Sequence, residues 1–578
     1  MIQLKVEQYS VFLPMRKPDA MRNFSEFQLE ATKQFAHTLI VVDDEAAADL
    51  DEPVKSAAKI KKPSRRDLAK PVAVTPSKST DLKHPLRADV LVETSMSLGL
   101  ICSVVKPKPN DGAPERVAKA SQKADILCVD WEMHRDNGKT AVDIITRVIA
   151  SDEANGGRFR LIAIYTGVAD KVRILNSVLK SIPKTTRDRK CLAIRENYIE
   201  SADGLRIVWL FKQGGTFPAN MAEFAIPESA LPSRLQKEFS LLSRGVLTNV
   251  AIATIASIRA ATHHVISKFG KEMDGPYFQH RSTIRSPEDA EEYATAIILS
   301  ELKNAIDRSS IAAKFAGAEA LDKALDDLPA DVELGDGNNF STIDRSLYKK
   351  LIIDGIKPTL KTNQPLQNKG AKFFTEHLAQ PLRADEDGRK LDLLKFAALT
   401  GLSADAEAPY AYHKPSLSLG TLVQDASGNY YLCVQASCDS VRVIAPQPFL
   451  FAKLEVVPEE SISSHKDKIE FVVPRKNKGI GKSFVCLKLS DKAPYAALIS
   501  IVFPPTEDEK VVAKKARDGT LYFEAATLPI GKRAEKHKRY LWIADVKRKR
   551  ALRTVQFIGQ EMGRIGFDEF EAFRRKYR

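Results

Sequence analysis

Residues 39–45, "LIVVDDE", join four apolar residues directly to three adjacent acids. A short, uninterrupted apolar run is typical of a strand that is buried on both faces of a parallel sheet. Neighbouring carboxylates repel one another unless a cation lies among them. The acids therefore either cap the solvated end of a strand or hold a metal ion.

Four later segments have the same apolar character: "LICSVV" (100–105), "DILCVD" (125–130), "FRLIAIYTG" (159–167) and "RIVWLF" (206–211). Helical patterns separate most of them, for example "TAVDIITRVIAS" (140–151). Alternation of short strands with helices indicates an α/β domain built on a parallel sheet. In such a sheet, ligands bind beyond the carboxyl ends of the strands.

Polar side chains stand at these strand ends. Asp43 and Asp44 follow the first strand, Asp130 follows the third, and Thr166 and Lys212 end the fourth and fifth. Clustered carboxylates form the kind of site that Mg²⁺ prefers, and a carboxylate can also attack phosphorus to give an acyl phosphate. A lysine and a hydroxyl would then neutralise charge on the phosphoryl oxygens. The alternative is that these residues only cap strands.

The segment "DWEMHRDNG" (130–138) strengthens the first interpretation. Met lies three residues and Gly eight residues after Asp130, and over residues 35–215 the chain resembles the receiver domain of two-component response regulators. The resemblance implies a flavodoxin-like domain with a five-stranded parallel sheet of order 2-1-3-4-5. It also implies that Asp130 accepts phosphate from a sensor histidine kinase.

The resemblance assigns further roles. Mg²⁺ would be held by Asp43, Asp44, Asp130 and the backbone carbonyl of Glu132. Thr166 and Lys212 would be the hydroxyl and the lysine of the acceptor site, and Trp209 the aromatic switch residue. The sequence departs from the family pattern at His134 and Gln213, where proline is usual, and in the long segment between Asp44 and Asp130.

Composition divides the chain into four parts. Residues 1–34 are an N-terminal extension, and residues 35–227 are the receiver-like domain with a flexible, basic insertion at 52–85. Residues 228–405 are predicted to be helical, and 406–578 to be a β-rich, basic C-terminal domain. The longest apolar stretch, 245–266, is interrupted by polar residues, which favours a buried helix over a membrane span.

The net charge of +14 is concentrated in two segments. Residues 54–84 contain nine Lys/Arg and two Asp, and residues 511–578 contain eighteen Lys/Arg and eight acids. Such segments either contact an anionic partner, such as nucleic acid, or are simply solvated. No known nucleic-acid-binding motif accompanies them. Six cysteines in so long a chain fit a reducing cytoplasm.

Two functions remain open for the whole chain. In the first, the protein is not an enzyme and takes up phosphoryl groups as a phosphate sink. The divergent receiver pattern with its basic insertion is similar to receiver proteins of Detocs-type defensive two-component systems against phage, which implies a companion response-regulator effector. In the second, the C-terminal half is itself an effector, either nucleic-acid-binding or enzymatic.

Overall fold

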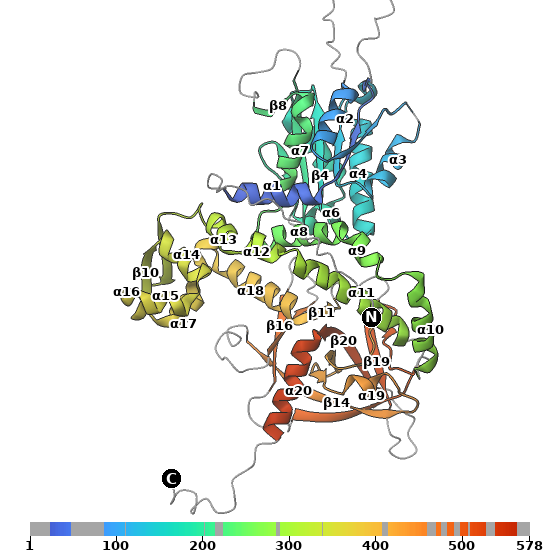
Figure 1. Ribbon diagram of the computed structural model, residues 1–578, viewed down its shortest axis with the longest axis vertical. Helices are drawn as coiled ribbons and strands as arrows, with labels where there is room; N and C mark the ends of the chain where they lie inside the picture. Colours follow the sequence, from blue (N-terminus) through green and yellow to red (C-terminus); the bar gives the residue numbers. More distant parts are fainter. Residues whose placement is uncertain are drawn as a thin grey trace, which may run out of the picture. The chain divides into compact units, whose positions relative to one another are not determined.

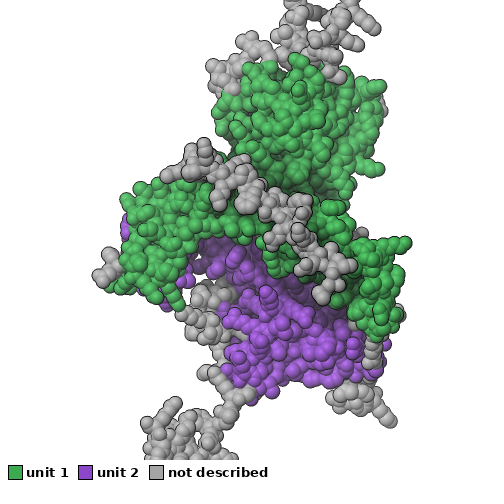
Figure 2. Space-filling view, in the orientation of Figure 1, with its two compact units in different colours: residues 1–332, 343–368 green, residues 333–342, 369–578 purple. Residues whose placement is uncertain are grey.

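The computed structural model describes residues 23–47, 86–109, 111–201, 203–213, 223–284, 289–337, 339–406, 414–458, 470–475, 483–489, 497–506, 509–526 and 538–562. The insertion predicted at 52–85 lies outside these residues. The chain forms two compact units (Figure 2). The first comprises residues 1–332 and 343–368, and the second residues 333–342 and 369–578. The predicted helical region, 228–405, is therefore shared between them.

The first unit is built on an eight-stranded sheet of order β2-β1-β3-β4-β7-β6-β5, with β8 also paired to β7. Five of these strands are the predicted ones: β1 (Thr38–Val42), β2 (Ile101–Val105), β3 (Ile126–Val129), β4 (Arg160–Thr166) and β7 (Leu205–Lys212). They are parallel, and their order β2-β1-β3-β4-β7 confirms the predicted 2-1-3-4-5.

Helices cover both faces of this sheet (Figure 1). On one face, α1 (Phe24–Phe35), α2 (Ala88–Ser97), α7 (Leu231–Ser240) and α8 (Val246–Ala260) enclose one apolar core. On the other, α3 (Ala113–Ser121), α4 (Lys139–Ala154) and α5 (Lys171–Ser181) enclose a second. The sheet strands are apolar on both sides because both sides are buried.

Several short elements extend the predicted fold. After α6 (Lys184–Lys190), β5 (Ala193–Ile194) and β6 (Tyr198–Glu200) form a hairpin that pairs antiparallel with β7. Strand β8 (Ala225–Ile226) pairs parallel with the end of β7. Strands of two or three residues contain too few alternations to be recognised in a sequence. Helix α1 lies in the predicted N-terminal extension and buries Phe27, Ala31 and Phe35, which are spaced four residues apart on one helix face.

The first unit continues through a series of helices. They are α9 (Thr262–Ile266), α10 (Asp274–Thr283), α11 (Asp289–Arg308), α12 (Ile311–Ala316), α13 (Ala318–Ala324), α14 (Arg345–Ile353), α15 (Ile356–Thr362) and α16 (Gln364–Gln367). Between α13 and α14 the chain forms a small sheet of β9 (Asp331–Asp336) and β10 (Asn339–Asp344), and residues 333–342 of this sheet belong to the second unit. Among the residues with described coordinates, no helix is long and apolar enough to cross a membrane.

The second unit contains a ten-stranded antiparallel sheet, in agreement with the predicted β-rich region. Its strands are β11 (Leu402–Asp405), β12 (Thr421–Gln424), β13 (Tyr430–Cys433), β14 (Gln447–Val457), β15 (Glu470–Arg475), β16 (Ser483–Leu489), β17 (Leu498–Phe503), β18 (Lys514–Lys515), β19 (Leu521–Ala525) and β20 (Lys538–Val546). Helices α17 (Gly370–His377), α18 (Glu386–Gly401), α19 (Ser437–Ser440) and α20 (Arg548–Met562) accompany them.

Candidate functional site

The predicted site residues meet at the carboxyl edge of the first sheet. The last residues of β1 and β3 are paired in the parallel register, so Asp43 and Asp130, which follow them, lie side by side. Thr166 and Lys212 are the last residues of β4 and β7, the next two strands across the sheet. All four side chains are buried.

Lys212 joins the two carboxylates. Its Nζ donates to Asp43 Oδ2 at 2.7 Å and to Asp130 Oδ2 at 2.8 Å. The three residues are 5%, 1% and 8% exposed, respectively, so little water screens their charges. One ammonium between two carboxylates leaves this buried group with surplus negative charge.

A third carboxylate completes an acidic pocket, which we define as Asp43, Asp44 and Asp130. One oxygen from each of the three lies within 4.8 Å of the others. Within the described residues, no donor reaches Asp44 Oδ1, although that oxygen is buried. A buried oxygen without a partner is costly, and hard oxygen donors grouped in this way fit Mg²⁺. The residues present therefore fit the ion predicted from the sequence.

The pKa values follow from burial and mutual attraction. Burial raises the pKa of Asp43, and repulsion from Asp130 adds to this, while attraction to Lys212 opposes it. Burial alone would lower the pKa of Lys212, but attraction to Asp130 and Asp43 outweighs it and raises that pKa above its ordinary value. The lysine thus stays charged, and a bound cation would relieve the repulsion between the carboxylates.

Comparison with known families agrees with this geometry. A family model described as a response receiver domain matches residues 35–217. These residues form a response receiver domain. Receiver domains in general have a histidine kinase as partner and bind Mg²⁺ through acidic residues. No curated protein and no solved structure matches the chain.

The loop after Asp130 explains the glycine of the receiver pattern. Gly138 has a φ of +84°, and a Cβ placed there would lie 2.2 Å from ring atoms of Trp131. Trp131 and Met133 are both buried in the core beneath this loop. Asp136 then accepts hydrogen bonds from the backbone N–H groups of Gly138 and Thr140, at 3.0 and 2.7 Å, where α4 begins. Only glycine fits both the backbone and the indole.

His134 stands where the family usually has proline, and the sequence did not predict that it would contact Asp44. Its backbone N–H donates to Asp44 Oδ2 at 2.8 Å, and its ring Nδ1 lies 3.2 Å from the same oxygen. His134 has a φ of +54°, and Arg135 and Asn137 also adopt positive φ. Proline cannot adopt this φ and has no N–H to donate. The departure from the family pattern is therefore part of the way this receiver holds Asp44.

The remaining predicted residues lie around the pocket. The Thr166 hydroxyl accepts from the Val168 backbone N–H at 3.3 Å, and the Trp209 indole N–H donates to the Val168 carbonyl at 3.3 Å. Trp209 is fully buried, with its ring centroid 5.9 Å from that of Phe224. The Glu132 backbone N–H lies 3.4 Å from Asp130 Oδ1. The role of its carbonyl as a metal ligand stays a prediction.

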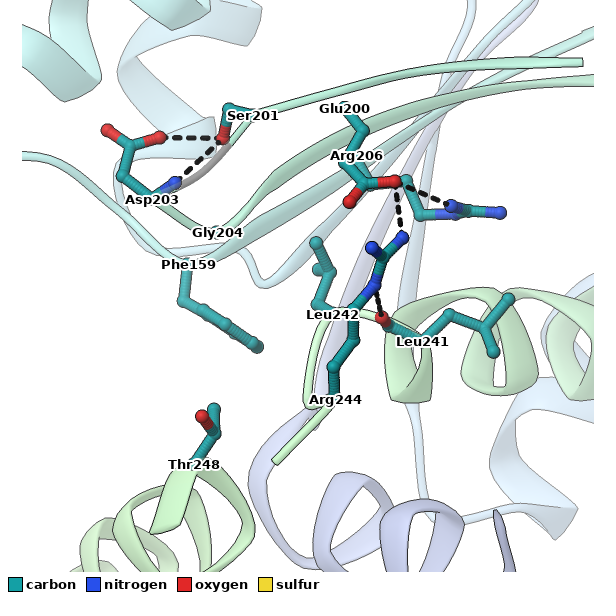
Figure 3. Close-up of a pocket in the computed structure, with 10 residues that line it drawn as sticks. All are labelled: Phe159, Glu200, Ser201, Asp203, Gly204, Arg206, Leu241, Leu242, Arg244 and Thr248. Carbon is teal, nitrogen blue, oxygen red and sulfur yellow. Dashed lines mark hydrogen bonds and ion pairs between the residues drawn. The ribbon is translucent and has the colours of Figure 1, made fainter. Parts of the chain in front are cut away.

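A cavity of about 450 Å³ lies at the opposite edge of the receiver sheet (Figure 3). It is lined by Phe159 just before β4, the turn between β6 and β7, and the connection between α7 and α8. Its two arginines are paired with acids: Arg244 with Glu200, and Arg206 with Glu238 at 2.9 Å. Each of these charges has a partner of opposite sign, and the residues around the cavity pack α7 and α8 against the sheet. We therefore assign the acceptor chemistry to the acidic pocket.

Proposed function

We propose that this protein is a response regulator in which Asp130 accepts a phosphoryl group from a sensor histidine kinase. The observation that carries the proposal is the bridge from Lys212 to Asp43 and Asp130, beside a third carboxylate, one oxygen of which has no partner among the described residues. Mg²⁺ would be held by Asp43, Asp44, Asp130 and the Glu132 backbone carbonyl. When bound, it would neutralise negative charge on the phosphoryl oxygens.

The chain's own residues account for the other requirements of the reaction. A carboxylate oxygen of Asp130 attacks phosphorus, the bond from phosphorus to the kinase histidine nitrogen breaks, and an acyl phosphate forms. Asp130 then loses the negative charge that holds Lys212. We infer that the Lys212 ammonium then donates to one phosphoryl oxygen. The Thr166 hydroxyl would give up its hydrogen bond from the Val168 N–H and donate to a second phosphoryl oxygen.

This exchange would also reach Trp209, since both Thr166 and Trp209 bind the Val168 backbone. If the hydroxyl moves toward the phosphoryl group, Val168 is released on one side and its carbonyl can shift. Trp209 would then act as the switch residue that reports phosphorylation to the body of the domain.

The direct test is phosphorylation by a small phosphodonor, such as phosphoramidate, with Mg²⁺, followed by intact mass measurement. We expect one added phosphoryl group in the native protein and none in Asp130→Asn. Asp170→Asn, which alters an exposed acid that caps α5, serves as a matched control and should be phosphorylated normally. An adduct of undiminished yield in Asp130→Asn would refute the assignment.

For the whole chain, we propose a non-enzymatic phosphate sink in a bacterial defence system, acting beside a companion effector. Its support is the resemblance of the receiver segment to Detocs-type receivers. The alternative, that the chain carries its own effector, is favoured by the size of the second unit, whose ten strands enclose two apolar cores.

A genetic test separates these two functions. Asp130→Ala is expressed with the cognate kinase and its companion regulator, and the response to phage is followed. A sink requires premature or stronger activation in this strain, because phosphoryl groups are no longer removed. A silenced pathway would instead assign the output to this chain and reject the sink.

A further inference from the structure

One face of the large sheet in the second unit carries a row of side chains that the receiver function does not use. Strand pairing sets one residue of each strand opposite the next, in the order Lys514, Tyr522, Leu541, Gln424 and Tyr430. Paired residues of neighbouring strands point to the same face of a sheet. The row therefore crosses β18, β19, β20, β12 and β13.

The adjoining residues show which way the row points. Phe523, Tyr540 and Trp542 alternate with it along β19 and β20 and are buried in one apolar core. The row consequently faces away from that core. Its first residue, Lys514, is exposed, Leu541 is 37% exposed, and Tyr430 at the other end is buried. The row thus runs from solvent into the protein.

At its inner end the row enters a cavity of about 280 Å³. Gln424, Tyr430 and Leu541 line one side, and Arg475 of β15 and Thr520 of the turn before β19 also line it. The walls therefore combine aromatic and aliphatic surface with an amide, a hydroxyl and a guanidinium. Ligand pockets in general have this composition, with apolar and aromatic walls and a few polar groups, and the volume is close to their lower end, about 300 Å³.

Cations surround the outer part of the row. Arg517, in the turn between β18 and β19, and Arg539 of β20 are exposed there, and Arg475, which lines the cavity, is exposed as well. The Arg539 guanidinium lies 4.6 Å from the centre of the Tyr522 ring, a cation–π contact that holds the two side chains together. These residues belong to the basic segment 511–578 and to β15, so folding brings the aromatic and basic groups onto one face.

We propose that this face binds single-stranded nucleic acid, with the phosphates along the exposed cations and one base in the cavity near Tyr522. A positive surface beside aromatic side chains is the general means by which proteins hold single strands. A duplex keeps its bases stacked and offers none to the cavity. An acidic peptide would use the cations, but it has no group that requires the aromatic walls and the amide.

The test uses the full-length protein and fluorescein-labelled twelve-nucleotide strands of mixed sequence, as DNA and as RNA, with the corresponding duplex. Binding is followed by fluorescence anisotropy at two salt concentrations. We expect single strands to bind more tightly than the duplex, and the affinity to fall as salt rises. The stronger of the DNA and RNA curves identifies the natural sugar.

Variants locate the binding face. Tyr522→Ala should weaken binding about tenfold, the usual effect of losing one stacked base, and Arg539→Glu should weaken it at least as much. Thr520→Trp, which fills the cavity, should also weaken binding. Lys372→Glu makes the same charge change on the exposed surface of α17 and should leave the affinity unchanged. Arg517→Glu, at an exposed position, replaces any variant whose thermal unfolding shows that it is misfolded.

Other outcomes would overturn the proposal. If Tyr522→Ala and Thr520→Trp bind normally while heparin displaces the strands, the face attracts polyanions in general. If poly-glutamate binds more tightly than either strand, the partner is an acidic protein. Absence of binding to every strand at low salt would exclude the site altogether.

Discussion

Replacement of His134 by glycine should weaken Mg²⁺ binding while leaving the receiver folded. The imidazole Nδ1 and the backbone N–H both contact Asp44 Oδ2, at 3.2 and 2.8 Å, while Oδ1 has no partner in the part of the chain that the structure describes. Glycine keeps the N–H and accepts the φ of +54°. The variant therefore removes the ring contact alone.

The expected magnitude follows from that lost contact. A hydrogen bond to a charged group is worth about 1.5–3 kcal/mol, and the loss of a group that orients a metal ligand typically weakens metal affinity about 10- to 100-fold. We expect His134→Gly to fall in this range. His134→Pro, which restores the family's usual residue, should be worse, because it removes the N–H as well and cannot adopt the positive φ.

Titration calorimetry with Mg²⁺ and thermal unfolding without it provide the two measurements. Arg135→Gly is the matched control, since it relieves a similar φ of +57° at an exposed position that does not contact Asp44. That variant should bind Mg²⁺ normally. Unchanged or tighter Mg²⁺ binding in His134→Gly would refute the view that the ring positions Asp44.

Three further perturbations test the same domain. Asp43→Asn should stabilise the metal-free protein near neutral pH, because the raised pKa of Asp43 means that its stabilising contribution is present at low pH and is lost as pH rises through that pKa. The difference in melting temperature between the variant and the native protein should shrink as the pH falls toward 3.8, the ordinary pKa of an aspartate. A variant that is less stable than the native protein at pH 7 would contradict this. Lys212→Met should destabilise the metal-free protein by about 3 kcal/mol in urea, since it leaves two buried carboxylates unpaired, and added Mg²⁺ should restore part of the loss. Gly138→Ala should lower the free energy of unfolding by about 3 kcal/mol, through the positive φ and the clash with Trp131. Gly156→Ala, at a φ of +86° with no described atom within 4 Å of the added Cβ, should lower it by only about 1 kcal/mol. Equal losses of stability would show that the clash with the indole does not matter.

The core of the receiver could be predicted because its strands carry a complete signal. β1, β3 and β4 are apolar at almost every position, and Asp43, Asp130, Thr166 and Lys212 each lie at or just after a strand end. Position in a parallel sheet then brings those ends together whatever the loops do. The bridge from Lys212 to Asp43 and Asp130 follows from that topology.

The parts that could not be predicted depend on backbone conformation and on short elements. The positive φ of His134 arises from a loop whose shape is set by the buried Trp131 and by Asp136 at the start of α4. No pattern in the sequence predicts that the ring of His134 contacts Asp44. Likewise, β6 is recognisable only once β7 is beside it, because three residues carry no periodicity of their own.

Strands β6 and β8 change which elements a movement of Trp209 would reach. In a sheet of five strands, the far edge of β7 would be open to a partner, but here β6 and β8 pair with that edge. Trp209 packs against Phe224, which directly precedes β8, and the Tyr165 hydroxyl donates to the Ile226 carbonyl of β8 at 2.8 Å. Tyr165 itself neighbours Thr166. A displacement that begins at the acceptor site would therefore pass first to β8 and then, along the chain, to α7. If Asp130 is phosphorylated as proposed, this route would carry the change into the helices that follow the receiver in the chain.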